Sequence, residues 1–408
     1  MPRTTATANS PLLQLDVRLL LEQGHDPLLD ILHMLDRLTP DGLLVLTTPF
    51  RPDPLITLLG ERGYRLNPVE LDPNHSGAYN NRAICHMQMG SFPQALADYT
   101  RAIELRPNQS DTYSNRGSVY SYLNRLPEAL RDFTKAIEIN PAFDGAYNNR
   151  GIIYSKMKRY SEALADYSRS LELDPENVGA YNNRCLVFQK LLRFEEALED
   201  CEKVLKIDPK NIITYTNRSA IYIQQGRYPK ALADCSRTIE LNPRYAKGYF
   251  LRGQIYTTLK RYPETLANYS KAIEIEPKNF RGYYNRARTY MATQRYPEAL
   301  ADFSKVIELV PSKPSAHFQR SDANFFLKRY PEALADIDRA IELDPKKPIH
   351  HATRGKILYH QGQIDAAIIC FNQVFELDPT NTENLNNRAG LHLLQKRLPE
   401  TIADCNRI

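Results

Sequence analysis

The sequence predicts a mainly α protein, in which helix pairs form a right-handed α-solenoid behind a small α/β two-layer domain. Prolines recur at one constant interval over most of the chain, and the apolar residues between them have helical spacing. Residues 11–72 do not share this period and contain short apolar runs typical of strands. At 408 residues the chain is too long for one globular core, which agrees with an extended array.

Composition narrows the functional classes. The net charge is only +5, with 53 basic and 48 acidic residues, so the concentrated basic stripe of a nucleic-acid-binding protein is not expected. No apolar run reaches the length of a membrane span, and residues 1–10 are polar, which predicts a disordered tail and no signal peptide. We therefore expect a cytoplasmic protein without nucleic-acid or membrane partners. The oligomeric state is left open.

The cysteines support the same compartment. They have no spacing typical of a metal site, and they fall within apolar helical stripes, so free thiols in a reducing environment and no metal or cofactor are expected. The six are Cys85, Cys185, Cys201, Cys235, Cys370 and Cys405.

The repeat is defined by its prolines. Ten of them follow one another at the same interval without a slip: Pro73, Pro107, Pro141, Pro175, Pro209, Pro243, Pro277, Pro311, Pro345 and Pro379. Seven more share a second fixed place in the unit: Pro93, Pro127, Pro229, Pro263, Pro297, Pro331 and Pro399. A fixed period in this range indicates a solenoid.

Each unit predicts two helices. The first has an aromatic, a small and an aromatic residue on one face, as in Tyr147, Gly151 and Tyr154. The second begins near a proline such as Pro263, which suits a first helical turn. It ends before the next period proline, because the residue before a proline avoids the helical region.

The segment AYNNRGIIYSKMKRYSEALADYSRSLELDP resembles a tetratricopeptide repeat at its small, aromatic and proline positions. The resemblance covers residues 73–408, with nine full repeats from Ser76 and a partial tenth. It implies a helix-pair superhelix that binds proteins in a concave groove. The RNA-reading pentatricopeptide alternative has a similar period but lacks the repeated aspartate-proline ending.

The N-terminal segment predicts a different fold. Residues 13–18 and 43–48 are expected as strands, residues 27–38 and 54–63 as helices, and residues 64–71 as an edge strand. Residues 11–72 are similar to a small bacterial domain of the sulfur-carrier-like superfamily. Two departures matter: residues 1–84 hold no cysteine, which excludes persulfide chemistry there, and the last strand of that family is missing.

An arginine never varies between the units. It is Arg82, Arg116, Arg150, Arg184, Arg218, Arg252, Arg286, Arg320, Arg354 and Arg388. At a fixed distance behind it an aspartate recurs in eight units, as Asp166 does behind Arg150, with Asn268 and Cys370 as the exceptions. An arginine in a packed interface needs a partner, so a ladder of Arg–Asp pairs is predicted. The alternative is a basic stripe that faces a ligand.

An asparagine column precedes the arginines: Asn81, Asn115, Asn149, Asn183, Asn217, Asn285 and Asn387. In the family that the chain resembles, this face of the first helix lines the groove. Asparagine carries a donor and an acceptor, so a ladder of them could pair with an extended peptide backbone. A solvated polar face without a ligand explains the pattern equally well.

The later units carry aromatic and basic residues on the same face. The candidate groove residues are Lys247, Phe250, Arg281, Tyr284, Arg288, Phe318, Phe325, Phe326, Lys356 and Tyr359. Aromatic residues flanked by bases suit a partner with apolar and acidic residues. Packing between adjacent first helices is the alternative. The column that would hold the second asparagine of a two-carboxylate clamp reads Ile84, Ser118 and Ile152 instead, so recognition of a chaperone C-terminus is not expected.

No motif in the chain predicts catalysis, and no catalytic residue is proposed: phosphate-binding Gly-rich loops, G-x-S-x-G and H-E-x-x-H are absent. The nine histidines are scattered, and the cluster of His350, His351 and His360 is expected to be packed or solvated. A protein-interaction scaffold that is not an enzyme is the favoured function. The alternative is an adaptor that targets a redox or sulfur-metabolism complex through the N-terminal domain.

The C-terminal unit breaks off at Ile408, before the proline that would complete it. We expect the natural protein to run on, with Leu391, Leu394, Ile402 and Ile408 partly uncovered.

Overall fold

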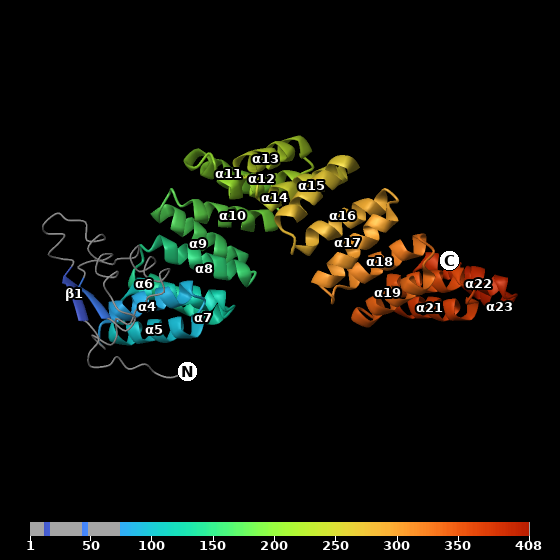
Figure 1. The fold of residues 1–408 in the computed structure, drawn as a ribbon, viewed down its shortest axis with the longest axis horizontal. Helices are drawn as coiled ribbons and strands as arrows, with labels where there is room; N and C mark the ends of the chain where they lie inside the picture. Colours follow the sequence, from blue (N-terminus) through green and yellow to red (C-terminus); the bar gives the residue numbers. More distant parts are fainter. Residues whose placement is uncertain (1–11, 17–42, 48–73, 408) are drawn as a thin grey trace. The chain divides into compact units, whose positions relative to one another are not determined.

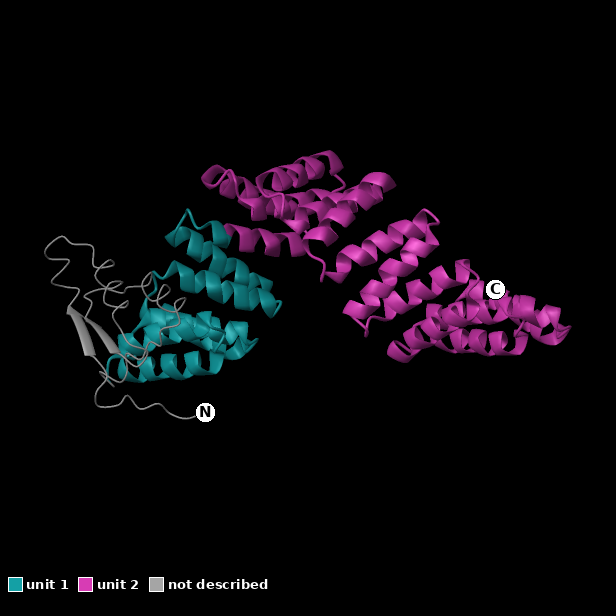
Figure 2. Cartoon of the chain, in the orientation of Figure 1, with its two compact units in different colours: residues 1–180 teal, residues 181–408 magenta. Residues whose placement is uncertain are grey.

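The structure is a computed structural model that describes residues 12–16, 43–47 and 74–407. The chain divides into two compact units, residues 1–180 and 181–408, and each is described by itself (Figure 2). Among the described residues, no helix combines the length and the apolar character that a bilayer span requires.

Two parallel strands lie near the N-terminus: β1 (Leu12–Asp16) and β2 (Leu43–Thr47), with Leu12 opposite Leu43 and Asp16 opposite Thr47. Both predicted strands are thus confirmed, with small differences at their ends. The predicted tail, helices and edge strand of this segment lie outside the described residues.

The remaining described chain, residues 74–407, forms the twenty predicted helices and no strand (Figure 1). The first helices of the repeats are α4 (Ser76–Gln88), α6 (Ser110–Tyr122), α8 (Asp144–Lys156), α10 (Val178–Lys190), α12 (Ile212–Gln224), α14 (Ala246–Thr258), α16 (Phe280–Ala292), α18 (Pro314–Phe326), α20 (Pro348–His360) and α22 (Thr382–Leu394). The second helices are α5 (Phe92–Leu105), α7 (Leu126–Ile139), α9 (Tyr160–Leu173), α11 (Phe194–Ile207), α13 (Tyr228–Leu241), α15 (Tyr262–Ile275), α17 (Tyr296–Leu309), α19 (Tyr330–Leu343), α21 (Ile364–Leu377) and α23 (Leu398–Cys405).

The turn inside each repeat contains a left-handed residue. In repeat 3, Lys158 has φ 61°, and the amide of the following Arg159 donates to the carbonyl of Tyr154 at 2.9 Å. This hydrogen bond closes the first helix and aims the chain into the second. The equivalent residues are Gly90, Asn124, Leu192, Gly226, Lys260, Gln294, Lys328, Gly362 and Lys396.

Small and large residues complement each other inside each repeat. A Cβ on Gly151 would lie 2.7 Å from the ring of Tyr167, so only glycine admits that ring. In repeat 4 both positions change together, to Cys185 and Cys201, whose Sγ atoms lie 3.3 Å apart. The two positions therefore change jointly, from a glycine and a ring to two thiols in contact.

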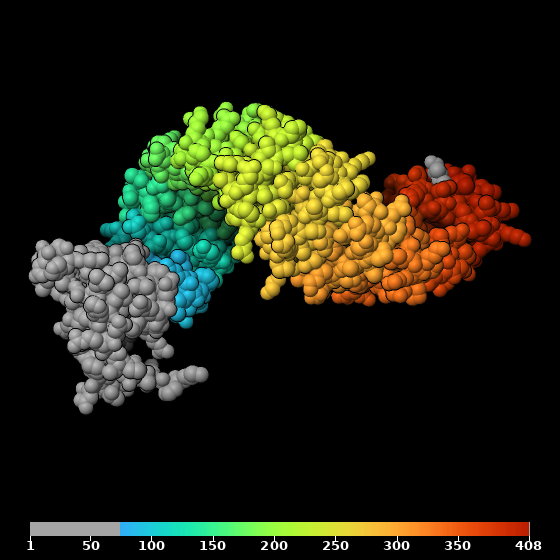
Figure 3. Space-filling view, turned by 45° about the horizontal axis from the view of Figure 1, so that its top comes forward, coloured from blue at the N-terminus to red at the C-terminus, as the bar shows by residue number. Residues whose placement is uncertain are grey.

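Within each unit the helices pack on their neighbours along the chain, in sequence order (Figure 3). Near the C-terminus, Leu394 and Ile402 are 63% and 60% exposed, as predicted, and Ile408 lies outside the described residues. The prediction for Leu391 was wrong. Leu391 is buried against Phe371, because α21 covers it.

Candidate functional site

The arginine column forms the predicted ladder. In repeat 3, Arg150 donates through Nε and Nη2 to the two carboxylate oxygens of Asp166, both at 2.8 Å, and this hydrogen bonding raises the pKa of Arg150. Seven further repeats hold the same pair: Arg82–Asp98, Arg116–Asp132, Arg184–Asp200, Arg218–Asp234, Arg286–Asp302, Arg320–Asp336 and Arg388–Asp404. These arginines are engaged within the fold, which favours the structural interpretation over a ligand-facing basic stripe.

Several of these arginines also reach the preceding repeat. Nη1 of Arg116 donates to Oγ1 of Thr100 at 3.1 Å, and Nη1 of Arg286 donates to Oγ of Ser270 at 2.9 Å. Each of these arginines therefore links its own two helices to the second helix of the repeat before it. The hydroxyl residue precedes the arginine by 16 residues, and the aspartate follows it by the same number. This spacing is visible in the sequence, but the hydroxyl contact was not predicted.

The two exceptions are compensated. Arg252 donates to Oδ1 of Asn268 at 2.8 Å. Arg354, which faces Cys370 instead of an aspartate, donates to Oδ1 of Asp338 at 2.7 Å and to Sγ of Cys370 at 3.2 Å. Asp338 occupies the position that a serine or threonine holds in other repeats. In this repeat the carboxylate that pairs with the arginine therefore precedes it in sequence, whereas in the repeats that hold the Arg–Asp pair it follows. The prediction that Arg354 would find another partner is confirmed.

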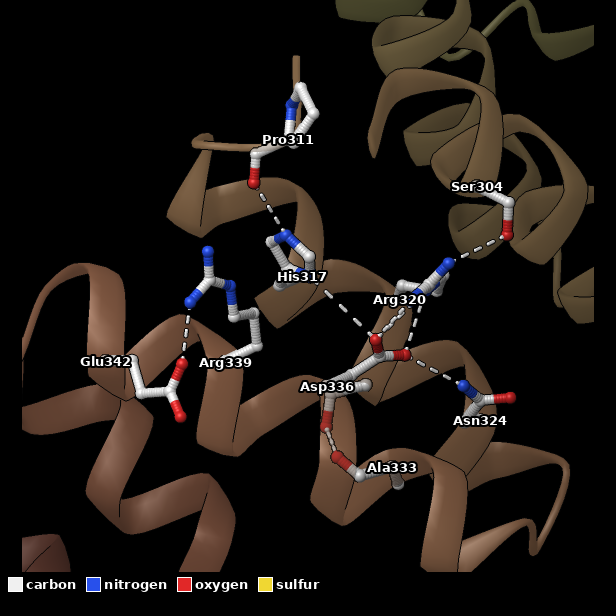
Figure 4. Close-up of polar contacts among 10 residues, drawn as sticks. Ser304, Pro311, His317, Arg320, Asn324, Ala333, Asp336, Arg339 and Glu342 are labelled. Carbon is white, nitrogen blue, oxygen red and sulfur yellow. Dashed lines mark hydrogen bonds and ion pairs between the residues drawn. The ribbon is translucent and has the colours of Figure 1, made fainter. Parts of the chain in front are cut away.

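Repeat 8 adds polar groups around its aspartate (Figure 4). Asp336 accepts from Arg320 and, at 3.0 Å, from Nδ2 of Asn324. Asn324 takes the place of the aromatic residue that other repeats hold there, such as Tyr290. Nε2 of His317 lies 3.0 Å from the carbonyl oxygen of Pro311.

The asparagine column lies between adjacent first helices. Nδ2 of Asn115 donates to Oδ1 of Asn80 in the preceding repeat at 3.4 Å, and Asn217 donates to Asn182 at the same distance. Asn285 donates to the backbone carbonyl of Arg281 at 2.8 Å. Asn217 is buried, whereas the other members are half-buried: Asn81, Asn115, Asn149, Asn183, Asn285 and Asn387. At Asn115 and Asn217 the amide thus contributes to the contact between repeats, and a role in peptide binding stays a prediction.

Most of the predicted aromatic residues form the floor of this face. The ring of Phe250 packs on Tyr269 at 5.7 Å, Tyr284 on Phe303 at 5.8 Å and Phe318 on His350 at 5.4 Å. All three are half-buried, as is Phe325. These contacts support the packing interpretation for these side chains.

The charged residues of the face remain accessible. Lys247, Arg281 and Arg288 are exposed, although the surrounding protein desolvates Lys247 and lowers its pKa. Asp322 is half-buried, and desolvation raises its pKa to about 6 against the attraction of Lys356. Lys356 forms an ion pair with Glu383 at 3.1 Å.

A group of exposed rings was only partly foreseen. Phe326 is 54% exposed and stacks on Tyr296 at 4.8 Å, and Tyr359 is 43% exposed. Phe326 and Tyr359 were predicted for this face, but the contact of Phe326 with Tyr296 and that of Tyr359 with His360 were not. Tyr330, which stacks on His360, was also missed.

Several histidines and cysteines are buried within the repeats. His350 and His351 are buried, and no group of three or more potential metal-ligating side chains occurs in the part of the chain that the structure describes. Burial raises the pKa of Cys235 to about 11, which makes its thiol a poor nucleophile at neutral pH.

Several solved structures are similar to this chain. A tetratricopeptide repeat protein from Parabacteroides merdae is 20% identical, with 61% of this chain and 98% of that chain covered and a TM-score of 0.48. YrrB, described as a tetratricopeptide protein with an unusual peptide-binding site, is 24% identical over 44% of this chain and 92% of its own, with a TM-score of 0.36. Yeast Tom70 is 16% identical, with 81% of this chain and 90% of that chain covered and a TM-score of 0.36. No curated protein matches the sequence.

Family models give the assignment. A tetratricopeptide repeat model matches residues 76–109, 110–143, 145–177 and 178–211. Further models of the same repeat match residues 201–233, 253–294, 284–348 and 351–381. Since these matches together cover more than half of the 408 residues, the chain belongs to the tetratricopeptide-repeat family.

Proposed function

We propose that this chain is a protein-interaction scaffold that binds an extended segment of a partner along the first helices of its repeats. The observation that carries the proposal is a stripe of side chains on these helices. Positions i, i+4, i+7 and i+11 lie on one face of a helix. In α16 they are Arg281, Asn285, Arg288 and Ala292, none of which is buried.

The stripe suits recognition because its members repeat in register. Successive first helices are offset by one repeat, so equivalent side chains form columns that an extended peptide can follow. The bases of this stripe outnumber its acids in repeats 6 and 7, where it carries Lys247, Arg281 and Arg288 and no carboxylate. The arginine ladder, by contrast, is engaged within the fold and is not part of the proposed binding surface.

We also propose a reducing, cytoplasmic location. The six cysteines all lie among the described residues and form no disulfide there, and four of them are buried, so the fold uses them as small apolar residues.

Panning a library of displayed peptides on the full chain tests the proposed function. Enriched peptides are then titrated by fluorescence anisotropy against the chain and two double variants. Replacing Lys247 and Arg288 with alanine should weaken binding by about tenfold, since each lost charged contact contributes about 1 kcal/mol or less at an exposed site.

The matched control replaces Lys203 and Lys206, which are exposed on the second helix α11, with alanine. Both variants remove two positive charges. Equal weakening in the two, or a library that yields no binding peptide, would contradict the proposal.

A further inference from the structure

Rings from four helices meet at the turn of repeat 8. The end of α18 and the end of α20 contribute rings that contact the first residues of α17 and α19. We name this set the repeat-8 aromatic cluster, and its members are Tyr296, Phe325, Phe326, Tyr330, Tyr359 and His360. Neighbouring centroids are 4.8–6.1 Å apart, so the rings form one connected surface.

Some rings of the cluster pack against the core of repeat 8, and others are exposed. Phe325 and Tyr330 pack against the buried residues Ala333 and Ile337. Phe326, Tyr359 and His360 remain exposed. Exposed rings fixed by packing below are suited to binding, because they lose little conformational entropy when a partner covers them.

An arginine beside the cluster has lost the contacts that its counterparts make. In five repeats the arginine before the second helix pairs with the glutamate three residues later: Arg125–Glu128, Arg159–Glu162, Arg193–Glu196, Arg261–Glu264 and Arg295–Glu298. In the same repeats it also lies over an aromatic ring of the first helix, as Arg295 does over Tyr290 at 4.6 Å.

Repeat 8 keeps the arginine and the glutamate, as Arg329 and Glu332, but loses the ion pair and the ring contact. Asn324 replaces the ring and is buried, donating to Asp336. Within the described residues, the exposed Arg329 side chain has neither an ion pair nor a ring contact, although Glu332 stands three residues later. Arg329 directly precedes Tyr330 of the cluster and follows the exposed Lys328. Two bases, one of them without its usual partners, therefore border the rings.

We propose that the repeat-8 aromatic cluster and Arg329 dock a partner segment in which an aromatic side chain is flanked by carboxylates. The rings supply an apolar contact for the partner's ring, and the Arg329 guanidinium supplies a two-pronged donor for a carboxylate. The proposal rests on the proposed scaffold function and names its partner chemistry and its repeat. Arg288, exposed on the preceding first helix, extends the same positive charge along the stripe.

Single-stranded nucleic acid also binds aromatic and basic residues, and the geometry favours a peptide over it. The stacked faces of Tyr296 and Phe326, at an interplanar angle of 7°, cover one another and leave less ring face for a base.

The test uses the full chain and four labelled probes in an anisotropy titration. The first is a twelve-residue peptide with two phenylalanines among aspartates. In the second the aspartates are lysines, in the third the phenylalanines are alanines, and the fourth is a twelve-nucleotide oligothymidine. We expect only the first to bind with micromolar affinity, and its binding to weaken as salt concentration rises.

Matched variants locate the contact. Phe326→Ala should weaken binding by about tenfold and Arg329→Gln by about fivefold. The controls change equivalent positions in repeat 2. Tyr122→Ala removes a ring that is 73% exposed and stacked on Phe92, and Arg125→Gln removes an arginine engaged by Glu128 and Tyr120. Each control should change binding by less than about twofold.

Circular dichroism of each variant checks that helical content is kept. The proposal is overturned if the lysine peptide or the oligothymidine binds as well as the acidic peptide. It is also overturned if the repeat-2 variants weaken binding as much as the repeat-8 variants, or if the acidic peptide does not bind. In that last case, library peptides that still bind the stripe would leave the scaffold function standing, and a library without binders would remove both.

Discussion

Single residues in this fold are constrained by charge pairing inside each repeat. The side chain of Asp132 is 1% exposed, and that of its partner Arg116 is 11% exposed. A buried pair contributes little relative to apolar residues, but loss of one member leaves a buried charge without compensation. The fold therefore depends on having both partners, which explains why the acid follows the arginine so regularly.

Replacing Asp132 with alanine should cost about 3–5 kcal/mol of unfolding free energy, because Arg116 keeps its burial and loses its main acceptor. Urea denaturation measures the loss. The control is Glu138→Ala, which breaks the exposed pair Lys135–Glu138 and should cost less than about 0.5 kcal/mol. Similar losses of unfolding free energy in the two variants would mean that the Arg116–Asp132 pair contributes no more than an exposed ion pair.

Asp322 predicts a dependence of stability on pH. Desolvation raises its pKa from the ordinary 3.8 to about 6 in the folded chain. Below about pH 3 the carboxyl is protonated in both the folded and the unfolded chain, because both pKa values lie higher, and it has no effect on stability. As the pH rises through 4 to 6 the unfolded chain releases the proton first, so Asp322 lowers stability, and the full cost is present above pH 6.

Asp322→Asn should therefore stabilise the chain by about 1–2 kcal/mol at pH 7.5 and leave its stability nearly unchanged at about pH 3. The measurement is the difference in urea midpoints at the two pH values. The exposed Glu202→Gln serves as the control and should show no such difference. A stabilisation that is equal at both pH values would point to packing instead of charge.

At the scale of the helix pair, the turn between the two helices is the feature that most constrains the chain. Ten residues in this column have φ between 56° and 77°, yet only three of them are glycine. A left-handed conformation costs a residue with a side chain roughly 1–2 kcal/mol. Leu192, which is 69% exposed, carries that cost without a compensating contact of a buried side chain.

Leu192→Gly should stabilise the protein by about 0.5–1 kcal/mol, since the relief of strain exceeds the extra entropy that glycine gives the unfolded chain. Gly226→Leu, the reverse change in the next repeat, should destabilise by a similar amount. Thermal and urea unfolding of the two variants provide the comparison. If both changes shift stability in the same direction, the turn geometry is not the cause.

These elements show which features sequence patterns can predict. The helix pairs and the Arg–Asp ladder were predictable, because proline, glycine and the paired charges recur at fixed spacing. The left-handed turn was not, because seven residues of four types other than glycine occupy that column. The hydroxyls that bind the arginines from the preceding repeat were also missed, since Ser and Thr alternate there with Glu202, Asp338 and Asn372.

The sequence predicted which helix face carries the candidate site, but not which of its rings are exposed. Phe250, Tyr284 and Phe318 fall on the same helical face as the exposed bases, but they are large enough to reach neighbouring helices and pack there. Periodicity identifies the face of a helix on which a residue lies. Whether a ring stands in solvent depends on the neighbouring helix, which periodicity within one helix does not describe.

At the scale of the whole molecule, stability is built from neighbouring repeats. Helices contact the next helix along the chain, and some first helices also contact the first helix of the next repeat, as α12 does α14. In such an array a local defect lowers the stability of its own repeat and of the adjoining interfaces, while distant repeats keep theirs. A single unfolding free energy does not describe a chain of this kind when cooperativity is incomplete.

The last prediction uses this property. Asp302→Ala leaves Arg286 in α16 without its carboxylate, although Ser270 of the preceding repeat still accepts a hydrogen bond from Nη1 at 2.9 Å. Amide hydrogen exchange should accelerate by at least about tenfold in α16 and α17, since loss of about 1.4 kcal/mol or more of local stability corresponds to that factor. A smaller acceleration should reach α15 and α18, which pack against them.

Helices α4 to α7 belong to the other compact unit. They should exchange at their original rates, because several repeats separate them along the chain from repeat 7. Lys305→Ala is the matched control, since it removes a charge from the same helix α17 and breaks the surface pair with Glu308, whose two side chains are 38% and 66% exposed. A uniform acceleration across both units in the Asp302 variant would show that the array unfolds as one cooperative body. An acceleration confined to repeat 7 and its neighbours would establish that the arginine ladder stabilises the solenoid one junction at a time.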